Sequence, residues 1–130
     1  MKTGLVIEDN SDNMVLITRL LEKAGYRTLQ AETGRAGVDM AVWQQPDFII
    51  LDIQLPDIDG IEVLQQLRDS EAGKNIPVIA MTSYAMTGDR EKIMMAGCTG
   101  YIEKPIDPAR VIDQIRKILE ESTENTGGWR

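Results

Sequence analysis

Three acidic side chains stand at the ends of two apolar segments of the sequence. Glu8 closes a predicted strand at residues 4–8 and Asp9 follows it, while Asp52 follows the four apolar residues 48–51. A short apolar run of this kind predicts a strand that is buried on both faces of a sheet. Open α/β sheets build their sites beyond the carboxyl ends of the strands, so we expect Asp52 to be the chemical centre.

Two further strand ends carry groups that complement carboxylates. Thr82 and Ser83 follow a predicted strand at residues 77–81, and Lys104 follows another at residues 100–103. Crowded carboxylates repel one another and need a cation nearby. A hydroxyl and an ammonium group can also stabilise the negative charge that develops on a phosphoryl group during its transfer.

The absence of histidine limits the chemistry that these residues can perform. It excludes a Ser-His-Asp triad, a Cys-His pair and a His-ligated zinc site. Carboxylates without imidazole suit a hard cation such as Mg²⁺, for which Glu8, Asp9 and Asp52 would supply oxygen ligands. A carboxylate beside such a cation can attack a phosphoryl group in line and become an acyl phosphate, and we assign this role to Asp52.

Five predicted strands alternate with five predicted helices. The strands are residues 4–8, 26–31, 48–51, 77–81 and 100–103, and the helices that follow them begin near residues 11, 33, 60, 86 and 107. This order predicts an α/β protein with a doubly wound five-stranded parallel sheet, a flavodoxin-like (βα)₅ fold with right-handed crossovers. All five strands would end at one edge, which would bring together Glu8, Asp9, Asp52, Thr82 and Lys104.

Charge and composition indicate the surroundings in which the protein works. A net charge of −7 argues against a nucleic-acid surface, which needs clustered Lys and Arg. No apolar run approaches the roughly 20 residues of a membrane span, and no signal peptide precedes the first strand. Cys98 is the only cysteine, so it cannot form an internal disulfide. We therefore expect a cytoplasmic protein that binds neither DNA nor a membrane.

Four short motifs resemble those of the receiver domains of two-component response regulators, the CheY-like superfamily. They are Ile7-Glu8-Asp9-Asn10, Leu51-Asp52-Ile53-Gln54-Leu55-Pro56, Met81-Thr82-Ser83 and Tyr101-Ile102-Glu103-Lys104-Pro105. They occur in the family's order, and the resemblance covers about residues 3–121. Within the family the sequence is similar to single-domain DivK-type receivers and to receivers attached to hybrid kinases.

The resemblance implies a phosphoacceptor with a metal site. Asp52 would accept a phosphoryl group from a phosphohistidine on a histidine kinase or a histidine phosphotransfer protein. Glu8 and Asp9 would be the metal-binding acids, with Asp9 as the more direct ligand. Asp52 and the backbone carbonyl of Gln54 would complete the protein ligands of Mg²⁺.

The same resemblance implies a switch. Lys104 would pair with the phosphate, Thr82 would be the switch hydroxyl and Tyr101 the switch aromatic. The Lys104–Pro105 peptide bond would be cis. Phosphorylation would alter the face formed by the fourth helix, fifth strand and fifth helix, and a downstream protein would bind that face.

We therefore expect a single-domain response regulator of a two-component phosphorelay, made of a receiver domain at residues 1–121 and a flexible tail at residues 122–130. Because the chain has no histidine, a partner must supply the phosphohistidine. The chain would not be an enzyme beyond its own phosphotransfer and autodephosphorylation. Phosphorylation-dependent dimerisation stays open, as does excision of the chain from a larger protein.

Two other classes of function stay open. An aspartate-nucleophile phosphohydrolase uses a similar set of Asp, Thr, Lys and Mg²⁺. The pattern of those enzymes has an acid two residues after the nucleophile, whereas this chain has Gln54 at that position. A flavodoxin-like binding module would instead need a loop rich in Gly, Ser or Thr after the first strand. Here that loop begins with Glu8 and Asp9, which would repel a phosphate unless a metal intervened.

Several residues near the site have simpler interpretations. Asp57 and Asp59 are expected to be solvated turn residues, and Cys98 a small buried hydrophobic residue. Tyr84, two residues past Thr82, is expected to lean over the phosphate and exclude water. The helix at about residues 86–96 is polar and is expected to be weakly anchored.

Overall fold

The computed structural model describes residues 1–83 and 87–128, without the side chains of residues 87–89 and 123–128. Strands and helices alternate along the chain in the order β1 Thr3–Ile7, α1 Ser11–Lys23, β2 Arg27–Ala31, α2 Gly34–Gln44, β3 Phe48–Asp52, α3 Gly60–Asp69, β4 Val78–Thr82, α4 Thr87–Met95, β5 Gly100–Glu103 and α5 Val111–Gly128. Each predicted strand is present, with bounds within two residues of the expectation. The predicted α/β fold is therefore confirmed.

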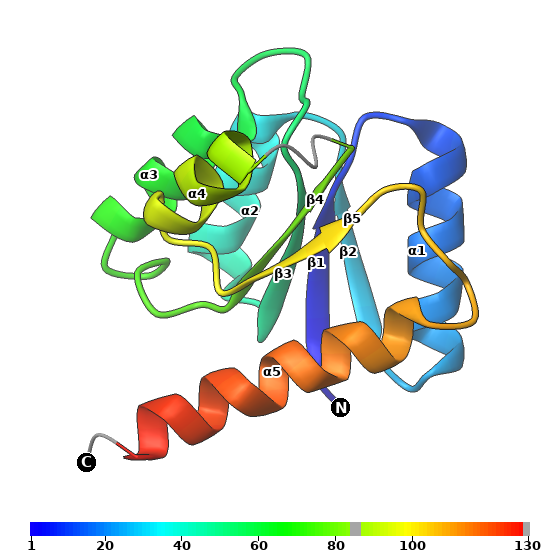
Figure 1. The fold of residues 1–130 in the computed structure, drawn as a ribbon. Coiled ribbons are helices and arrows are strands. Elements are labelled where there is room, and N and C mark those ends of the chain that lie inside the picture. The colour runs from blue at the N-terminus through cyan, green and yellow to red at the C-terminus, as the bar shows by residue number, and fades with distance from the viewer. Residues whose placement is uncertain (84–86, 129–130) are drawn as a thin grey trace.

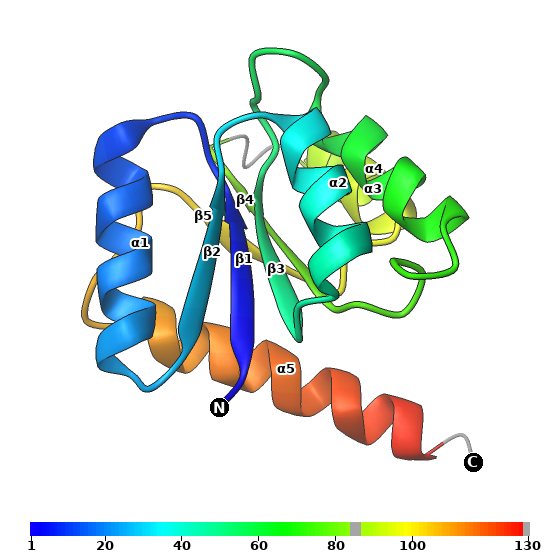
Figure 2. The ribbon, with the colours of Figure 1, turned by 180° about the vertical axis from the view of Figure 1, so that it is seen from behind.

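The strands form one parallel sheet in the order β2-β1-β3-β4-β5. Helices α1 and α5 cover one face of this sheet, and α2, α3 and α4 cover the other (Figures 1 and 2). All five residues of β3 are buried, as expected for a strand with a helix layer on both faces. The sheet therefore separates two apolar clusters, one against α2 and α3 and the other against α1 and α5.

Local signals in the sequence explain where the helices begin and end. The Asn10 side chain accepts a hydrogen bond from the backbone of Asn13, and Thr33 does the same at the start of α2. Gly25 follows α1 with a φ of +99°, a conformation that glycine adopts without steric cost. The caps at Asn10 and Thr33 end the loops that follow β1 and β2 at the carboxyl edge of the sheet.

Helix α5 extends to Gly128, and the flexible tail expected at residues 122–130 stays a prediction. Residues 120–126 contain neither proline nor glycine, and the residues there that favour a helix end are Asn125 and Gly127. Figure 1 shows the last turns of α5 projecting past the sheet.

Among the described side chains of helix α4, residues 90–95, one is buried, in line with the expected weak anchoring. Ile93 is buried, whereas Met94 and Met95 are 44% and 88% exposed. Cys98, just after the helix, is buried as expected. No helix within the described residues is both long and apolar enough to cross a membrane.

Candidate functional site

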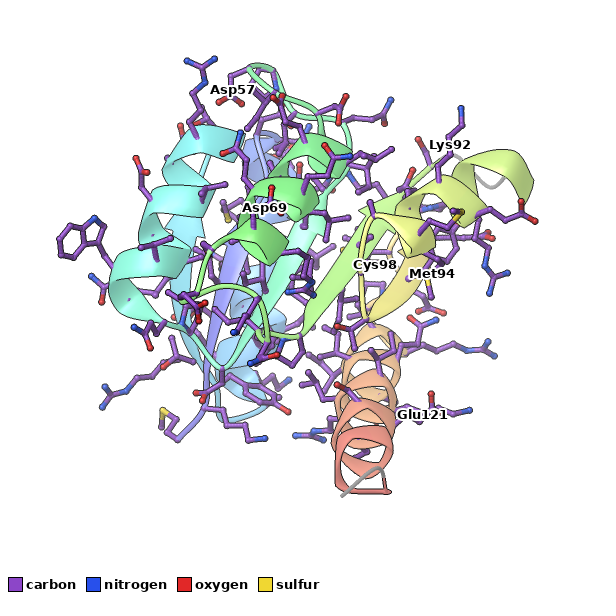
Figure 3. All side chains as sticks on the ribbon, turned by 90° about the vertical axis from the view of Figure 1, so that its left-hand side faces the viewer. Asp57, Asp69, Lys92, Met94, Cys98 and Glu121 are labelled. Carbon is purple, nitrogen blue, oxygen red and sulfur yellow. The ribbon has the colours of Figure 1, made fainter. Side chains whose placement is uncertain are left out.

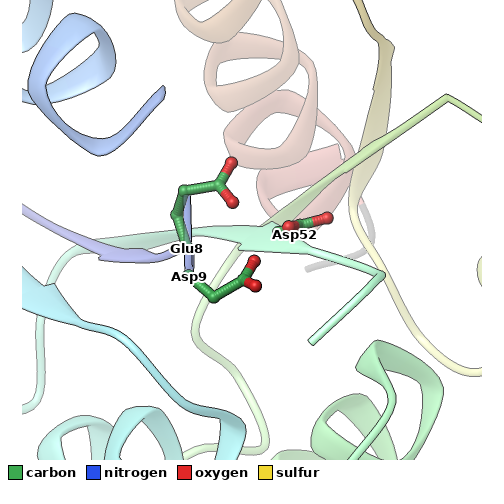
Figure 4. A group of neighbouring side chains, drawn as sticks. All are labelled: Glu8, Asp9 and Asp52. Carbon is green, nitrogen blue, oxygen red and sulfur yellow. The ribbon is translucent and has the colours of Figure 1, made fainter. Parts of the chain in front are cut away.

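Three carboxylates meet at the carboxyl edge of the sheet. Ile7 and Leu51 are register partners on the neighbouring strands β1 and β3, so the next residues, Glu8 and Asp52, lie side by side. Glu8, Asp9 and Asp52 each present an oxygen within 4.8 Å of the others (Figure 4). Glu8 and Asp52 are buried, while Asp9 is exposed. The cluster is therefore open to solvent on the side of Asp9.

Lys104 brings a positive charge to this cluster from β5. Its Nζ lies 3.2 Å from Oε1 of Glu8 and 3.3 Å from Oδ1 of Asp52. Its backbone N–H donates to the carbonyl of Thr82, which continues the pairing of β4 with β5 to the edge of the sheet. The Lys104–Pro105 peptide bond that follows is cis, as expected.

Glu8 has an unusual protonation equilibrium. Burial raises its pKa from 4.5 to about 7, and the hydrogen bond with Asp52 and the charge of Asp52 act in the same direction. The charge of Lys104 and the N–H of Asn10 lower that pKa, but do not outweigh burial. The ammonium group of Lys104 is therefore insufficient to keep Glu8 ionised below neutral pH.

The loop after β3 contacts Asp52 directly. The backbone N–H of Gln54 donates to Oδ1 of Asp52 at 3.0 Å. The hydroxyl of Ser83, at the end of β4, donates to the side-chain Oε1 of Gln54 at 3.2 Å. The backbone of Gln54 thus lies beside the carboxylate, which is the placement that a role in the metal site requires; that role stays a prediction.

The two predicted switch residues lie on the neighbouring strands β4 and β5. Thr82 is fully buried at the end of β4. Tyr101 is half-buried, pairs in register with Ala80, and has the guanidinium of Arg90 from α4 over its ring at 5.2 Å. Their roles as switch hydroxyl and switch aromatic stay predictions, and Tyr84 lies outside the described residues.

Asp57 and Asp59 have structural roles that sequence reasoning did not assign. Asp59 accepts a hydrogen bond from the backbone of Glu62 and caps α3. Asp57 accepts hydrogen bonds from the backbone N–H groups of Gly34 and Arg35, at 2.8 and 3.0 Å. It therefore lies at the first turn of α2, where Figure 3 labels it. These bonds, chiefly the one from Arg35, lower the pKa of Asp57 to about 2.

A groove of about 540 Å³ opens beside the exposed carboxylate of Asp9. It is lined by Asp9, Ile53, Gln54, Leu55, Pro56, Asp59, Ile61, Lys92 and Ile93. The groove lies between the loop after β3 and helices α3 and α4. A small molecule could therefore approach the acidic cluster from this side.

The donor atoms of the cluster suit a divalent cation. Three carboxylates with oxygens within 4.8 Å form a hard, anionic donor set, and the exposed position of Asp9 leaves room for water ligands. The chain has no histidine, and its one thiol is buried away from these carboxylates in the cluster against α2 and α3. Mg²⁺ or a similar oxygen-preferring ion fits this donor set better than zinc does.

Known proteins are similar to this chain in sequence and in fold. The chain is 43% identical to the polar-differentiation response regulator DivK of Brucella ovis, over 93% of this chain and 98% of that protein. The receiver domain of the sensor histidine kinase PA1611 of Pseudomonas aeruginosa, described with a magnesium ion coordinated in its active-site cleft, is 33% identical with a TM-score of 0.84. That similarity covers 92% of this chain and 98% of the solved one.

A third similarity supports the fold alone. The chemotaxis response regulator CheY4 of Vibrio cholerae has a TM-score of 0.87 at 24% identity, over 91% of this chain and 98% of its own.

The response regulator receiver domain family matches residues 5–116, which contain the acidic cluster, Thr82 and Lys104. The chain therefore belongs to the response regulator receiver domain family.

Proposed function

We propose that this receiver domain accepts a phosphoryl group on Asp52 from a phosphohistidine of a histidine kinase or histidine phosphotransfer protein. The observation that carries the proposal is the buried Asp52 carboxylate, held 3.3 Å from the ammonium of Lys104 in a cluster with Glu8 and Asp9. A carboxylate with an adjacent fixed cation is both a nucleophile and a site for an acyl phosphate.

The transfer forms one bond and breaks one. A carboxylate oxygen of Asp52 attacks the phosphorus in line, and the bond between phosphorus and the donor histidine nitrogen breaks. That nitrogen keeps the bonding electron pair. Lys104 offsets negative charge on the phosphoryl oxygens because its Nζ already lies within 3.3 Å of Asp52.

A divalent cation completes the proposed site. Glu8, Asp9, Asp52 and the backbone carbonyl of Gln54 would hold Mg²⁺. When bound, the ion would offset the carboxylate charges and the charge of the incoming phosphoryl group. Support comes from the donor set of the acidic cluster and from the magnesium ion described for the PA1611 receiver domain.

Phosphorylation would act as a switch of protein binding. The phosphate adds negative charge and acceptor oxygens, which would attract the hydroxyl of Thr82 and the ammonium of Lys104. Tyr101 would rotate inward as Thr82 moves, and the face formed by α4, β5 and α5 would change. A downstream protein, or a second copy of the chain, would read this face.

The energies suit a partial shift rather than a complete one. Moving a two-state equilibrium from 1:99 to 99:1 requires about 5.5 kcal/mol. Each hydrogen bond to a charged group contributes roughly 1.5–3 kcal/mol, so the new bonds from Thr82 and Lys104 supply half of this or more. Binding of the downstream partner would complete the shift. The proposed chemistry remains the chain's own phosphotransfer and loss of its phosphate, without turnover of a separate substrate.

The mass of the intact protein tests the phosphoacceptor. After incubation with Mg²⁺ and acetyl phosphate, the wild type should gain one phosphoryl group and Asp52→Asn none. Asp47→Asn is the matched control, because Asp47 precedes β3 at the opposite edge of the sheet and bonds only the backbone of Thr3 among the hydrogen bonds described. It should gain one group as the wild type does.

A second donor guards against poor reactivity with acetyl phosphate. A phosphorylated histidine phosphotransfer protein, added with Mg²⁺, should label the wild type and Asp47→Asn but not Asp52→Asn. Labelling of Asp52→Asn at one equivalent would refute the assignment of Asp52. Failure of both donors to label the wild type would refute the proposed function.

A further inference from the structure

The loop between β3 and α3, residues 53–59, carries a predicted metal ligand. The same loop is hydrogen-bonded to α2, more than 20 positions earlier in the chain. Gln54 lies near the start of this loop and Asp57 near its end. The Asp57 carboxylate binds the first two residues of α2 through both of its oxygens. We infer that Asp57 is a positioning residue that holds this loop in the geometry that binds the metal ion. The inference rests on the proposed function, because it assumes that Mg²⁺ binds beside Gln54.

Several contacts attach the far half of the loop to α2. Oδ1 of Asp57 accepts from Gly34 at 2.8 Å and Oδ2 accepts from Arg35 at 3.0 Å. The N-terminal end of a helix carries partial positive charge, so an ionised carboxylate binds there more strongly than a neutral group does. Next to Asp57, Ile58 is buried, and a Cβ added to Gly34 would lie only 2.6 Å from its side chain. Loop and helix therefore pack without a gap.

The near half of the loop is more exposed and is bonded to the acidic site and to the end of β4. Gln54 and Pro56 are exposed and Leu55 is half-buried. Two side-chain bonds are described for this part: the N–H of Gln54 donates to Oδ1 of Asp52 at 3.0 Å, and the exposed hydroxyl of Ser83 donates to Oε1 of Gln54 at 3.2 Å. The base of the loop is closed by the N–H of Gly60, which donates to the carbonyl of Ile53. Asp57, which lies between Gln54 and that closure, thus ties the loop to a second element, α2.

Loss of this anchor would affect metal binding through the population of the competent loop. A ligand that needs one conformation has an apparent Kd equal to its intrinsic Kd divided by the fraction of molecules in that conformation. Removing two charge-assisted hydrogen bonds lowers that fraction and leaves the carboxylates of the cluster in place. The expected result is a roughly 3- to 10-fold weaker affinity for Mg²⁺.

Asp57 also carries charge, and the experiment must separate charge from position. Its Oδ2 lies 4.0 Å from the guanidinium of Arg35, an exposed pair that partly offsets the charge. Asp57→Asn removes the charge and keeps one oxygen acceptor for α2, whereas Asp57→Ala removes both. If Asp57 acts through position, Asp57→Asn should retain most of the Mg²⁺ affinity that Asp57→Ala loses.

The test is calorimetric titration of the full chain with Mg²⁺ alone. Asp57→Ala should weaken Mg²⁺ binding by 3-fold or more, and Asp57→Asn by less than 2-fold. Asp47→Ala is the matched control: it also removes a carboxylate that accepts a backbone N–H, at 2.7 Å from Thr3 and remote from the loop. It should change the affinity by less than 2-fold. Gly34→Ala, which pushes on Ile58 and on Val63 of α3 without changing any charge, should weaken binding as Asp57→Ala does.

Three results would overturn the inference while the wild type binds Mg²⁺. They are an unchanged affinity in Asp57→Ala, an equal loss in Asp57→Asn and Asp57→Ala, or an equal loss in Asp47→Ala. If Asp57→Ala does not fold, Gly34→Ala and Asp57→Asn decide the question by the same limits. A wild type that binds no Mg²⁺ would instead refute the proposed metal site, and the inference with it.

Discussion

The ammonium of Lys104 lies 3.2 Å from Oε1 of Glu8, although 96 positions separate the two residues in the chain. Both side chains are largely withdrawn from solvent, with exposed fractions of 16% for Lys104 and 2% for Glu8. Even so, the pKa of Glu8 remains raised, to about 7, because burial and Asp52 outweigh Lys104. The metal-free site is therefore a place where excess negative charge destabilises the fold.

Replacing Lys104 should make this destabilisation larger. Lys104→Met removes the cation from two buried carboxylates and keeps most of the side-chain volume. We expect a loss of about 2–4 kcal/mol in the free energy of unfolding at pH 8, measured by urea unfolding in EDTA. At pH 5 the loss should be smaller, since Glu8 is then protonated.

A surface ion pair provides the control for Lys104. Lys74 lies 2.9 Å from Glu71, but the two side chains are 48% and 91% exposed. Lys74→Met should cost less than about 1 kcal/mol at either pH. Equal losses in the two variants would contradict a special role for the charge of Lys104.

The raised pKa of Glu8 predicts a dependence of stability on pH. Between pH 4.5 and about 7 the folded chain binds more protons at Glu8 than the unfolded chain does. Stability from this residue is therefore greatest at low pH and is lost as the pH rises through this window. In EDTA, the free energy of unfolding of the wild type should fall by roughly 1–3 kcal/mol from pH 5 to pH 8 because of Glu8 alone.

Glu8→Gln isolates this contribution, because glutamine has a similar shape and does not titrate. Its free energy of unfolding should fall less between pH 5 and pH 8 than that of the wild type. Asp57 does not confuse the comparison, since its lowered pKa of about 2 places its titration below this range. Identical pH dependence in Glu8→Gln and the wild type would show that the pKa of Glu8 is not raised.

The residues that lie at strand ends could be predicted because topology alone places them. The apolar run at residues 48–51 fixes β3, and parallel pairing with β1 then sets Glu8 beside Asp52. Caps are similarly local: Asn10 and Thr33 bond backbone groups three residues away. Sequence patterns within a few residues, together with the alternation of strands and helices along the chain, therefore predict the strand ends and the helix caps.

The role of Asp57 could not be read in this way. Its partners, Gly34 and Arg35, precede it by 23 and 22 residues, and no local pattern links an acid after Pro56 to the start of another helix. Arg68 is a similar case, because all three of its acceptors are backbone carbonyls, which leave no trace in the sequence. Tertiary hydrogen bonds to the main chain are visible only once the fold is known.

Arg68 gives the last prediction, which concerns the anchoring of α4. From the last turn of α3, its guanidinium donates to the carbonyls of Gly73, Ile76 and Gly97, each at 2.9 Å. Gly97 follows α4, so this one side chain ties the end of α4 to the loop between α3 and β4. Burial lowers the pKa of Arg68, which reflects the cost of holding the charge there.

Arg68→Met should remove one donor from each of three carbonyls, of which that of Gly73 keeps the N–H of Ile76, and should lower the free energy of unfolding by about 2–4 kcal/mol. Arg68→Lys should recover only part of this loss, because an ammonium cannot span the three acceptors as a planar guanidinium does. Arg110→Met is the control: Arg110 is 79% exposed beside Asp107, so its loss should cost less than about 1 kcal/mol.

Amide hydrogen exchange locates the effect of Arg68 within the fold. In Arg68→Met, the amides of Ala96 and Gly97, which bond back to Lys92 and Met94 at the end of α4, should exchange faster relative to those of β3. Uniformly faster exchange across the whole chain would indicate a general loss of stability and would remove the case for a specific anchor.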